Sequence, residues 1–86
     1  MVQIHRSRKF EKQYKQLDRK IQQKVEDRVN IFIINPFDSV LKTHRLVGQL
    51  SGKWSLNVTA DYRVIFSYDL DGIFLEAVGT HSQLYG

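Results

Sequence analysis

The chain has 86 residues, and its 13 Lys and Arg against nine Asp and Glu give a formal charge of +4. This length predicts one domain, residues 1–86, with a small core. The lack of cysteine excludes disulfides and thiolate metal sites, and it fits a reducing cytoplasm. No run approaches the ~18 apolar residues that a membrane span needs. The N-terminus also lacks an apolar signal core, so we expect a cytoplasmic protein with no membrane partner.

The N-terminal part predicts a short strand followed by a helix. Residues 2–5 alternate between apolar and polar side chains, as in a strand with one buried face. Ser7 is a suitable N-cap for a helix over residues 8–17. The apolar residues of this helix lie on one face; they are Phe10, Tyr14 and Leu17.

A second helix is predicted directly after the first. Asp18 is its expected N-cap, because Asp satisfies backbone donors at helix starts and competes with them inside helices. The helix should end at Asn35, since Pro36 disfavours helical geometry in the residue before it. Its apolar stripe is Ile21, Val25, Val29, Phe32 and Ile33. Two helices joined so closely form an antiparallel hairpin.

The C-terminal half predicts a connection and then three strands in a meander. Residues 37–52 carry turn signals at both ends, and so long an ordered loop often carries function. Alternating, β-branched and aromatic residues predict strands over 53–58, 62–68 and 73–78. Between the last two, Asp69-Leu70-Asp71-Gly72 favours a hairpin turn. The predicted fold is α+β with the order β-α-α-β-β-β, the N-terminal helical hairpin packing on one face of a mainly antiparallel sheet.

Four short motifs resemble one family of small bacterial proteins. They are His44-Arg45-Leu46, Gly52-Lys53-Trp54, Asp61-Tyr62-Arg63-Val64-Ile65-Phe66 and the terminal Gly79-Thr80-His81-Ser82-Gln83-Leu84-Tyr85-Gly86. Together with the order of elements, they resemble the RelE/ParE toxin superfamily of bacterial type II toxin–antitoxin systems, and its YafQ-like branch of mRNA interferases in particular. The resemblance runs along the whole chain, and the terminal Gly-Thr-His motif is its most specific part.

The resemblance implies a RelE-like fold and an endoribonuclease that cuts mRNA on the ribosome. It also implies a cognate antitoxin protein as a partner. His81 matches the principal catalytic histidine, and His44 matches a functional histidine in the loop before the second strand. Asp61 matches an acidic residue before the central strand, Arg63 a central-strand arginine, and Tyr85 an aromatic residue that contacts substrate.

Two positions depart from the pattern of this branch. Asn57 stands where a second sheet histidine is expected, and Ala77 stands where an arginine precedes the Gly-Thr-His motif. Asn57 cannot transfer a proton, so it is a candidate RNA contact rather than an acid or base.

The candidate residues suit RNA cleavage with no metal or other cofactor. The 2′-OH must lose a proton, the phosphorane needs its charge compensated, and the 5′ oxygen must gain a proton. An unperturbed histidine pKa of ~6.5 suits His81 and His44 for either proton transfer. Arg63 can clamp a phosphate with two donors, and Asp61 could orient a histidine or act as base.

Further residues are candidates for binding RNA. Tyr85 or Trp54 could stack an exposed base, and Lys53 could contact the phosphate backbone. The lysines of the two helices would add charge toward mRNA or ribosomal RNA; they are Lys9, Lys12, Lys15, Lys20 and Lys24.

Each candidate also has a structural interpretation. His81 could be a turn residue bonded to backbone, and Asp61 could shape the turn at Ala60-Asp61. Arg63 could pair with Glu76 across the hairpin. Trp54 fits the core, because its strand face also carries Leu56 and Val58. His5 fits an exposed edge, and the spacing of the histidines indicates no metal site.

Two other functions remain open on the same fold. One is a ParE-like inhibitor of DNA gyrase, although chains of that type generally lack the histidine-bearing C-terminal motif. The other is a degenerate, non-catalytic member that only binds its antitoxin, to which Asn57 and Ala77 point. In every case we expect an acidic antitoxin segment to wrap the basic, apolar-grooved surface and to fold on binding.

Overall fold

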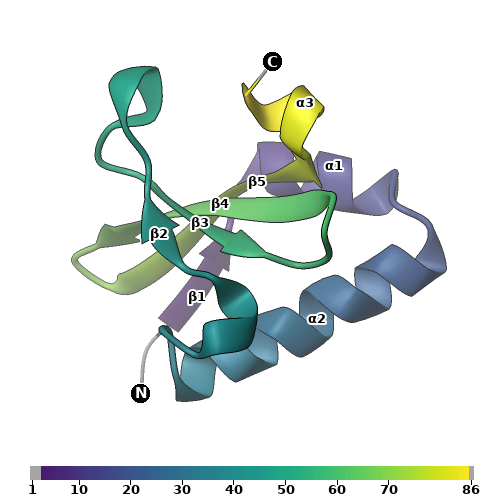
Figure 1. The fold of residues 1–86 in the computed structure, drawn as a ribbon, viewed down its shortest axis with the longest axis horizontal. Coiled ribbons are helices and arrows are strands. Elements are labelled where there is room, and N and C mark those ends of the chain that lie inside the picture. Colours follow the sequence, from purple (N-terminus) through teal and green to yellow (C-terminus); the bar gives the residue numbers. More distant parts are fainter. Residues whose placement is uncertain (1–2, 86) are drawn as a thin grey trace.

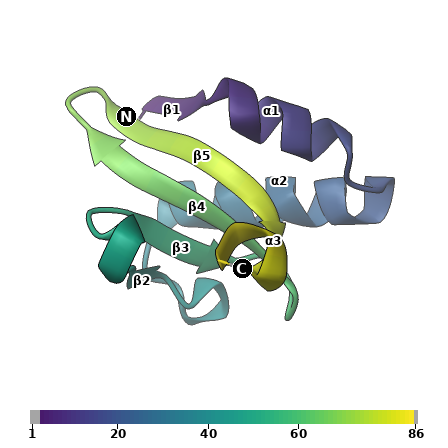
Figure 2. The same ribbon diagram turned by 90° about the horizontal axis from the view of Figure 1, so that it is seen from above.

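The computed structural model describes residues 3–85, and it shows helices packed against a five-stranded sheet (Figures 1 and 2). The elements in chain order are β1 (Gln3–Arg6), α1 (Arg8–Lys15), α2 (Arg19–Ile34), η1 (Ser39–Leu41), β2 (His44–Arg45), η2 (Gly48–Leu50), β3 (Trp54–Asn57), β4 (Tyr62–Asp69), β5 (Gly72–Thr80) and α3 (His81–Tyr85). The predicted α+β fold with its β-α-α-β-β-β order is confirmed. The two-residue strand β2, inside the predicted connection, was not predicted as such.

The sheet is mainly antiparallel, as expected. Its strand order is β1-β5-β4-β3-β2, and only the β1–β5 pair is parallel among the described strands. The chain leaves β1 through both helices and returns as the meander β3-β4-β5, which places β4 in the centre of the sheet. The two predicted helix starts are confirmed by their caps. The Ser7 Oγ accepts from the Phe10 amide at 2.9 Å, and the Asp18 Oδ1 accepts from the Ile21 amide at 2.9 Å.

The core lies between α1, α2 and one face of the sheet. Its buried side chains are Phe10, Val25, Val29, Phe32, Leu41, Leu56, Val58, Val64, Phe66, Ile73, Leu75 and Val78. The interpretation of Trp54 as a core residue is confirmed, because its ring packs against this cluster and lies 6.4 Å from the Phe66 ring in a stacked arrangement. His5 is exposed on β1, also as predicted.

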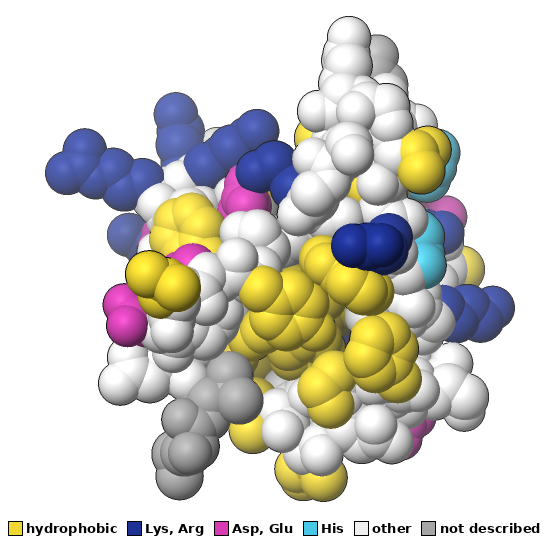
Figure 3. All heavy atoms as spheres, turned by 90° about the vertical axis from the view of Figure 1, so that its left-hand side faces the viewer, with side chains coloured by type: hydrophobic (Ala, Val, Ile, Leu, Met, Phe, Trp, Pro, Cys, Tyr) yellow, Lys and Arg dark blue, Asp and Glu magenta, His cyan; other side chains and the backbone are white. Residues whose placement is uncertain are grey.

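The prediction that Ile33 belongs to the buried stripe of α2 is wrong, since its side chain is 43 % exposed. Ile33 lies one residue, or about 100° of helix, beyond the buried Phe32 and so falls outside the stripe. Together with Tyr68 and Leu70 it flanks a hollow of about 350 Å³ between the end of α2 and the β4–β5 hairpin. We call the hollow flanked by Ile33, Tyr68 and Leu70 the apolar surface. Hydrophobic side chains gather in the middle of the face shown in Figure 3.

The β4–β5 hairpin closes as predicted, but its glycine has an additional role. The Asp69 Oδ1 accepts from the amides of Asp71 and Gly72 at 2.9 and 2.8 Å. Gly72 has a φ of 147°, and a Cβ at this position would lie 2.3 Å from the Gln3 carbonyl oxygen. Gly72 therefore lets β1 approach β5 closely.

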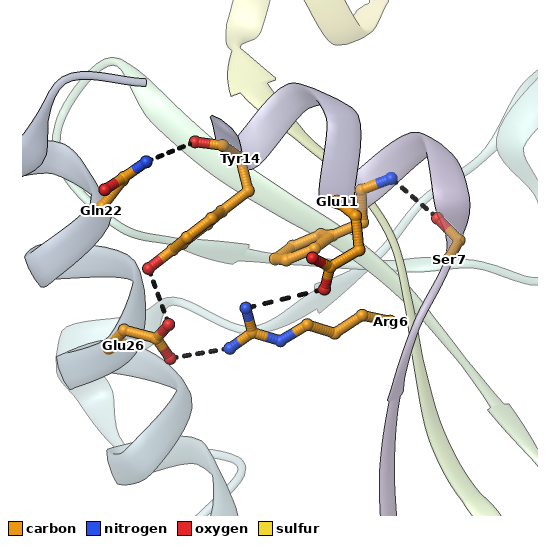
Figure 4. A network of polar contacts seen from close by, with 7 residues as sticks. Arg6, Ser7, Glu11, Tyr14, Gln22 and Glu26 are labelled. Carbon is orange, nitrogen blue, oxygen red and sulfur yellow. Dashed lines mark hydrogen bonds and ion pairs between the residues drawn. The ribbon is translucent and has the colours of Figure 1, made fainter. Parts of the chain in front are cut away.

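A polar network joins β1 to both helices (Figure 4). The Arg6 guanidinium donates to Glu26 Oε1 at 2.7 Å and lies 5.2 Å from the centre of the Tyr14 ring. The Tyr14 hydroxyl donates to the other Glu26 oxygen at 2.7 Å. Burial raises the pKa of Tyr14, and the hydrogen bond to Glu26 and its charge act in the same direction.

No helix between residues 3 and 85 is long and apolar enough to cross a membrane.

Candidate active site

A groove of about 540 Å³ lies on the sheet face that the long helices leave open. Asn57 of β3 and Arg63 of β4 are register partners, and each is followed along its strand by a buried core residue. Because side chains alternate along a strand, both point away from the core. In Figure 1, α3 and the loop that carries η2 stand above the sheet on the side opposite α2. The groove is lined by Lys42, His44, Leu46, Val47, Leu50, Asn57, Arg63, His81 and Tyr85.

Five of the predicted site residues therefore lie around one groove. His44 comes from β2, Asn57 from β3, Arg63 from β4, and His81 and Tyr85 come from α3. These positions span 42 residues of sequence, from 44 to 85 inclusive, and the meander brings them together. His44 and His81 thus line the same groove.

His81 is positioned by the start of α3. Its backbone amide donates to the Asp61 carbonyl oxygen at 3.0 Å. Thr80 and Gln83 form a capping box: the Gln83 Oε1 accepts from the Thr80 amide at 2.9 Å, and the Thr80 Oγ1 accepts from the Gln83 amide at 3.2 Å. The Tyr85 ring lies one helical turn away, with its centre 4.6 Å from that of His81. The short helix α3 therefore places Tyr85 beside the histidine.

His44 is oriented by the loop before it. One ring nitrogen, Nδ1, lies 2.8 Å from the Lys42 carbonyl oxygen. A carbonyl only accepts, so this contact is a hydrogen bond when Nδ1 carries the proton. In the neutral ring this leaves Nε2 unprotonated and able to accept a proton. Lys42 has a left-handed backbone with a φ of 47°, which turns the chain sharply into β2.

Asp61 and Lys53 do not line the groove. Asp61 is exposed, and its backbone makes two hydrogen bonds: its carbonyl accepts from the His81 amide, and its amide donates to the Thr59 hydroxyl at 3.2 Å. This geometry agrees with the turn-shaping interpretation, and a proton-transfer role for its carboxylate stays a prediction. Lys53 forms an ion pair with Glu76 instead. Its role in RNA binding also stays a prediction.

The alternative pairing of Arg63 with Glu76 is wrong. Arg63 lies opposite Gly79 in the β4–β5 register, and its guanidinium donates to the Ala60 carbonyl oxygen at 3.0 Å. Glu76 lies three residues from Gly79, at the bulge where the β4–β5 register shifts between Ile65 and Phe66, and it pairs with Lys53. The guanidinium of Arg63 therefore keeps donors for a ligand.

The groove has a cationic character. Lys42 and Arg63 contribute positive charge, and among residues 3–85 no carboxylate lines it. Such a site favours an anion. Within the described part of the chain, no cluster of three His, Cys, Asp or Glu side chains is arranged to hold a metal ion.

Sequence reasoning missed the wall of the groove and one residue beneath it. The wall is Lys42, Leu46, Val47 and Leu50, all in the connection whose length was the one signal of function. Beneath Tyr85 lies Ser55, which is fully buried and whose Oγ accepts from the Tyr85 hydroxyl at 3.0 Å. Its signal was a polar position on the outward face of β3, two residues before Asn57.

The architecture of the chain is the RelE-like fold. Solved structures with this fold include E. coli YafQ, at 24 % identity over 100 % of both chains with a TM-score of 0.84. They also include YafQ in the E. coli DinJ–YafQ complex, at 25 % identity over 100 % of both chains with a TM-score of 0.79. A YoeB/ParE toxin from Agrobacterium tumefaciens has 20 % identity over 94 % of this chain and 99 % of its own, with a TM-score of 0.78.

The family assignment comes from the sequence as a whole. Residues 2–86 match the family described as the bacterial toxin of type II toxin-antitoxin system, YafQ. This chain therefore belongs to the YafQ family of type II toxins, and the resemblance read from its motifs is confirmed. A search of curated proteins found no match.

Proposed function

We propose that this toxin is a ribosome-dependent endoribonuclease that cleaves mRNA in the cytoplasm, with residues 1–86 acting as one domain. The observation that carries the proposal is the groove itself, where two histidines and an arginine from three separate elements line one cationic hollow. These are the groups that 2′-OH attack on a phosphodiester requires: a base, an acid and a cation.

The geometry supports a division of roles between the two histidines. His44 Nε2 is the proposed base, because the Lys42 carbonyl holds a proton on Nδ1 and leaves Nε2 free to take the 2′-OH proton. The 2′ oxygen then bonds to phosphorus, and Arg63 offsets the charge of the phosphorane with its remaining donors. His81, protonated, gives its proton to the 5′ oxygen as the P–O5′ bond breaks. The products are a 2′,3′-cyclic phosphate and a 5′-hydroxyl end.

Asn57 and Tyr85 are assigned to binding. The Asn57 amide lies next to Arg63 in the sheet, so it can bond a phosphate or a base while taking no part in proton transfer. This division does not need the second sheet histidine that Asn57 replaces. The Tyr85 ring is half-buried beside His81 and offers a face on which an unpaired base can stack.

The dependence on the ribosome follows from the small size of the site. The groove offers few groups to a long, flexible substrate, so a second surface must hold the mRNA in register. We expect the purified toxin to cut ribosome-bound mRNA well and a naked transcript poorly. The measurement is mapping of 5′ ends on the same mRNA with and without ribosomes, and of cellular mRNA after expression of the toxin.

Other outcomes of this experiment would overturn the proposal. Efficient cleavage of the naked transcript would remove the ribosome dependence. Growth arrest with intact mRNA and inhibited DNA supercoiling would favour the gyrase-inhibitor alternative. Antitoxin binding with neither effect would favour the degenerate, non-catalytic alternative.

We also propose a cognate antitoxin protein as the partner of this chain. Solved relatives occur in the E. coli DinJ–YafQ complex and in a YoeB–YefM complex from Staphylococcus aureus. The apolar surface supports a protein partner here, since two neighbours in sequence of its lining residues are exposed as well: Ile34, which follows Ile33, is 87 % exposed, and Phe37, which follows Pro36, is 61 % exposed. The net positive charge favours acidic segments in that partner. Adding the antitoxin should suppress the cleavage measured above.

A further inference from the structure

A buried serine lies under the helix that carries the proposed catalytic histidine. Ser55 is 0 % exposed and is the one buried polar or charged residue in the described chain. It sits on β3 between Trp54 and Leu56, on the outward face of the sheet, where Asn57 follows two positions later. A buried hydroxyl without a partner is costly, and here Tyr85 supplies the hydrogen bond at 3.0 Å.

This hydrogen bond ties the end of α3 to the sheet. α3 has only five residues, His81–Tyr85, which is too short to be stable through its own hydrogen bonds. Its start is held by the Thr80–Gln83 capping box and by the His81 amide on Asp61. Its end is held by the Tyr85 hydroxyl on Ser55. With both ends fixed, the His81 ring and the Tyr85 ring keep their 4.6 Å separation.

Resting on the proposed function, we infer that Ser55 is a positioning residue for His81, acting through the Tyr85 hydroxyl. Ser55 is not among the residues that line the groove. Its hydroxyl fixes the orientation of Tyr85, and the Tyr85 ring limits the positions of the His81 imidazole. A proton transfer depends steeply on such placement, so a looser α3 should slow the chemical step more than it weakens substrate binding.

The test removes the hydrogen bond from each side and follows His81 directly. The Ser55→Ala and Tyr85→Phe variants and the double variant are made in the full chain, together with Ser67→Ala and Tyr68→Phe as matched controls on the neighbouring strand β4. NMR measures the His81 ring proton shifts, which carry the ring current of Tyr85. Single-turnover cleavage of ribosome-bound mRNA gives the rate of the chemical step and the KM separately.

We expect Ser55→Ala and Tyr85→Phe to move the His81 shifts toward those of an unstructured peptide, to similar extents. The chemical step should slow by about three- to tenfold, the equivalent of one neutral hydrogen bond, with the KM nearly constant. The double variant should be no worse than either single variant, because both remove the same bond. The two control variants should leave His81 shifts and cleavage unchanged.

Unchanged His81 shifts in Ser55→Ala would overturn the inference, as would additive effects in the double variant. A lower melting temperature with an unmoved His81 would make Ser55 merely structural. The NMR measurement needs no ribonuclease activity, so it separates this inference from the proposed function. If the toxin cleaves no RNA while the shifts move as expected, the proposed function fails and the positioning of His81 by Ser55 stands.

Discussion

His81 is the first residue of the short helix α3, directly after the end of β5. Its amide is bonded to Asp61, its ring lies beside Tyr85, and the ring itself stays exposed at the groove. The backbone contact would survive any side-chain replacement at position 81. An exposed ring on so firmly held a backbone is a poor contributor to stability but a well-placed proton donor.

We therefore expect His81→Gln to keep the fold and the binding of antitoxin and to lower cleavage by ~10²–10⁴-fold, the usual worth of a positioned acid or base. Cleavage and thermal melting are measured on one preparation. His5→Gln is the matched control, since His5 is also exposed but lies on β1, away from the groove. A lowered melting temperature with intact cleavage per folded molecule would contradict a catalytic role and restore the turn-residue interpretation.

At the level of elements, the hairpin between β4 and β5 depends on one glycine. Gly72→Ala would put a Cβ 2.3 Å from the backbone oxygen of Gln3, at a φ of 147° that side-chain-bearing residues rarely adopt. We expect the free energy of unfolding to fall by about 2–4 kcal/mol. Backbone strain at position 72 contributes to this loss, and so does the displacement of β1 by the added methyl group. Urea denaturation measures this loss.

Gly52→Ala is the control for this substitution. Gly52 also has a positive φ, 92°, but nothing lies within 4 Å of a Cβ built there. Gly52→Ala should therefore lower the free energy of unfolding by about 1 kcal/mol, through backbone strain alone. Equal losses in the two variants would mean that contact with β1 contributes nothing, and that the hairpin turn explains the whole effect.

The elements that could be predicted from sequence are those with local signals. Ser7 and Asp18 predict the starts of the two long helices. Alternating, β-branched and aromatic residues predict the strands β3, β4 and β5. Strand β2 could not be predicted, because two residues are too few for a pattern and its pairing with β3 is a tertiary contact. Ile33 was misplaced for a similar reason: only the packed structure shows where the stripe of α2 leaves the core.

The candidate site also has features that the sequence predicts and features that only the folded structure shows. His44, Arg63, His81 and Tyr85 could be named from motifs, and the topology brings them together. The partners of Lys53 and Arg63 could not be named, since they depend on the strand register, which places Arg63 opposite Gly79, and on the tertiary contact of Lys53 with Glu76. Ser55 was missed because a serine in a strand gives no sign of being buried.

At the scale of the whole molecule, ion pairs among the described residues connect distant segments on both sides of the sheet. On the helical side, Arg6, Tyr14 and Glu26 join β1, α1 and α2 (Figure 4). On the open side, Lys53 reaches from the start of β3 across β4 to Glu76 of β5. Each ties together segments far apart in the sequence, so each contributes only once the whole fold has formed.

The open-side ion pair makes stability depend on pH. Burial raises the pKa of Glu76, but hydrogen bonds from Lys53 and Ser67 and the charges of Lys53 and Lys9 outweigh it, so the pKa lies below its usual value of 4.5. The unfolded chain therefore binds more protons than the folded chain in mildly acid solution. The stabilisation is fully present above pH 4.5 and is lost as the pH falls through the lowered pKa.

We expect Glu76→Gln to lower the free energy of unfolding by about 1 kcal/mol at neutral pH, where the pair is charged and partly screened by solvent. The difference from the unmodified protein should shrink below pH 4.5 and disappear once Glu76 is protonated in both states. Urea denaturation at a series of pH values measures this difference, with Glu11→Gln as control, since Glu11 lies 4.0 Å from Arg6 and its side chain is 46 % exposed. A difference that stays constant from neutral to acid pH would show that the carboxylate charge is not what stabilises this side of the sheet.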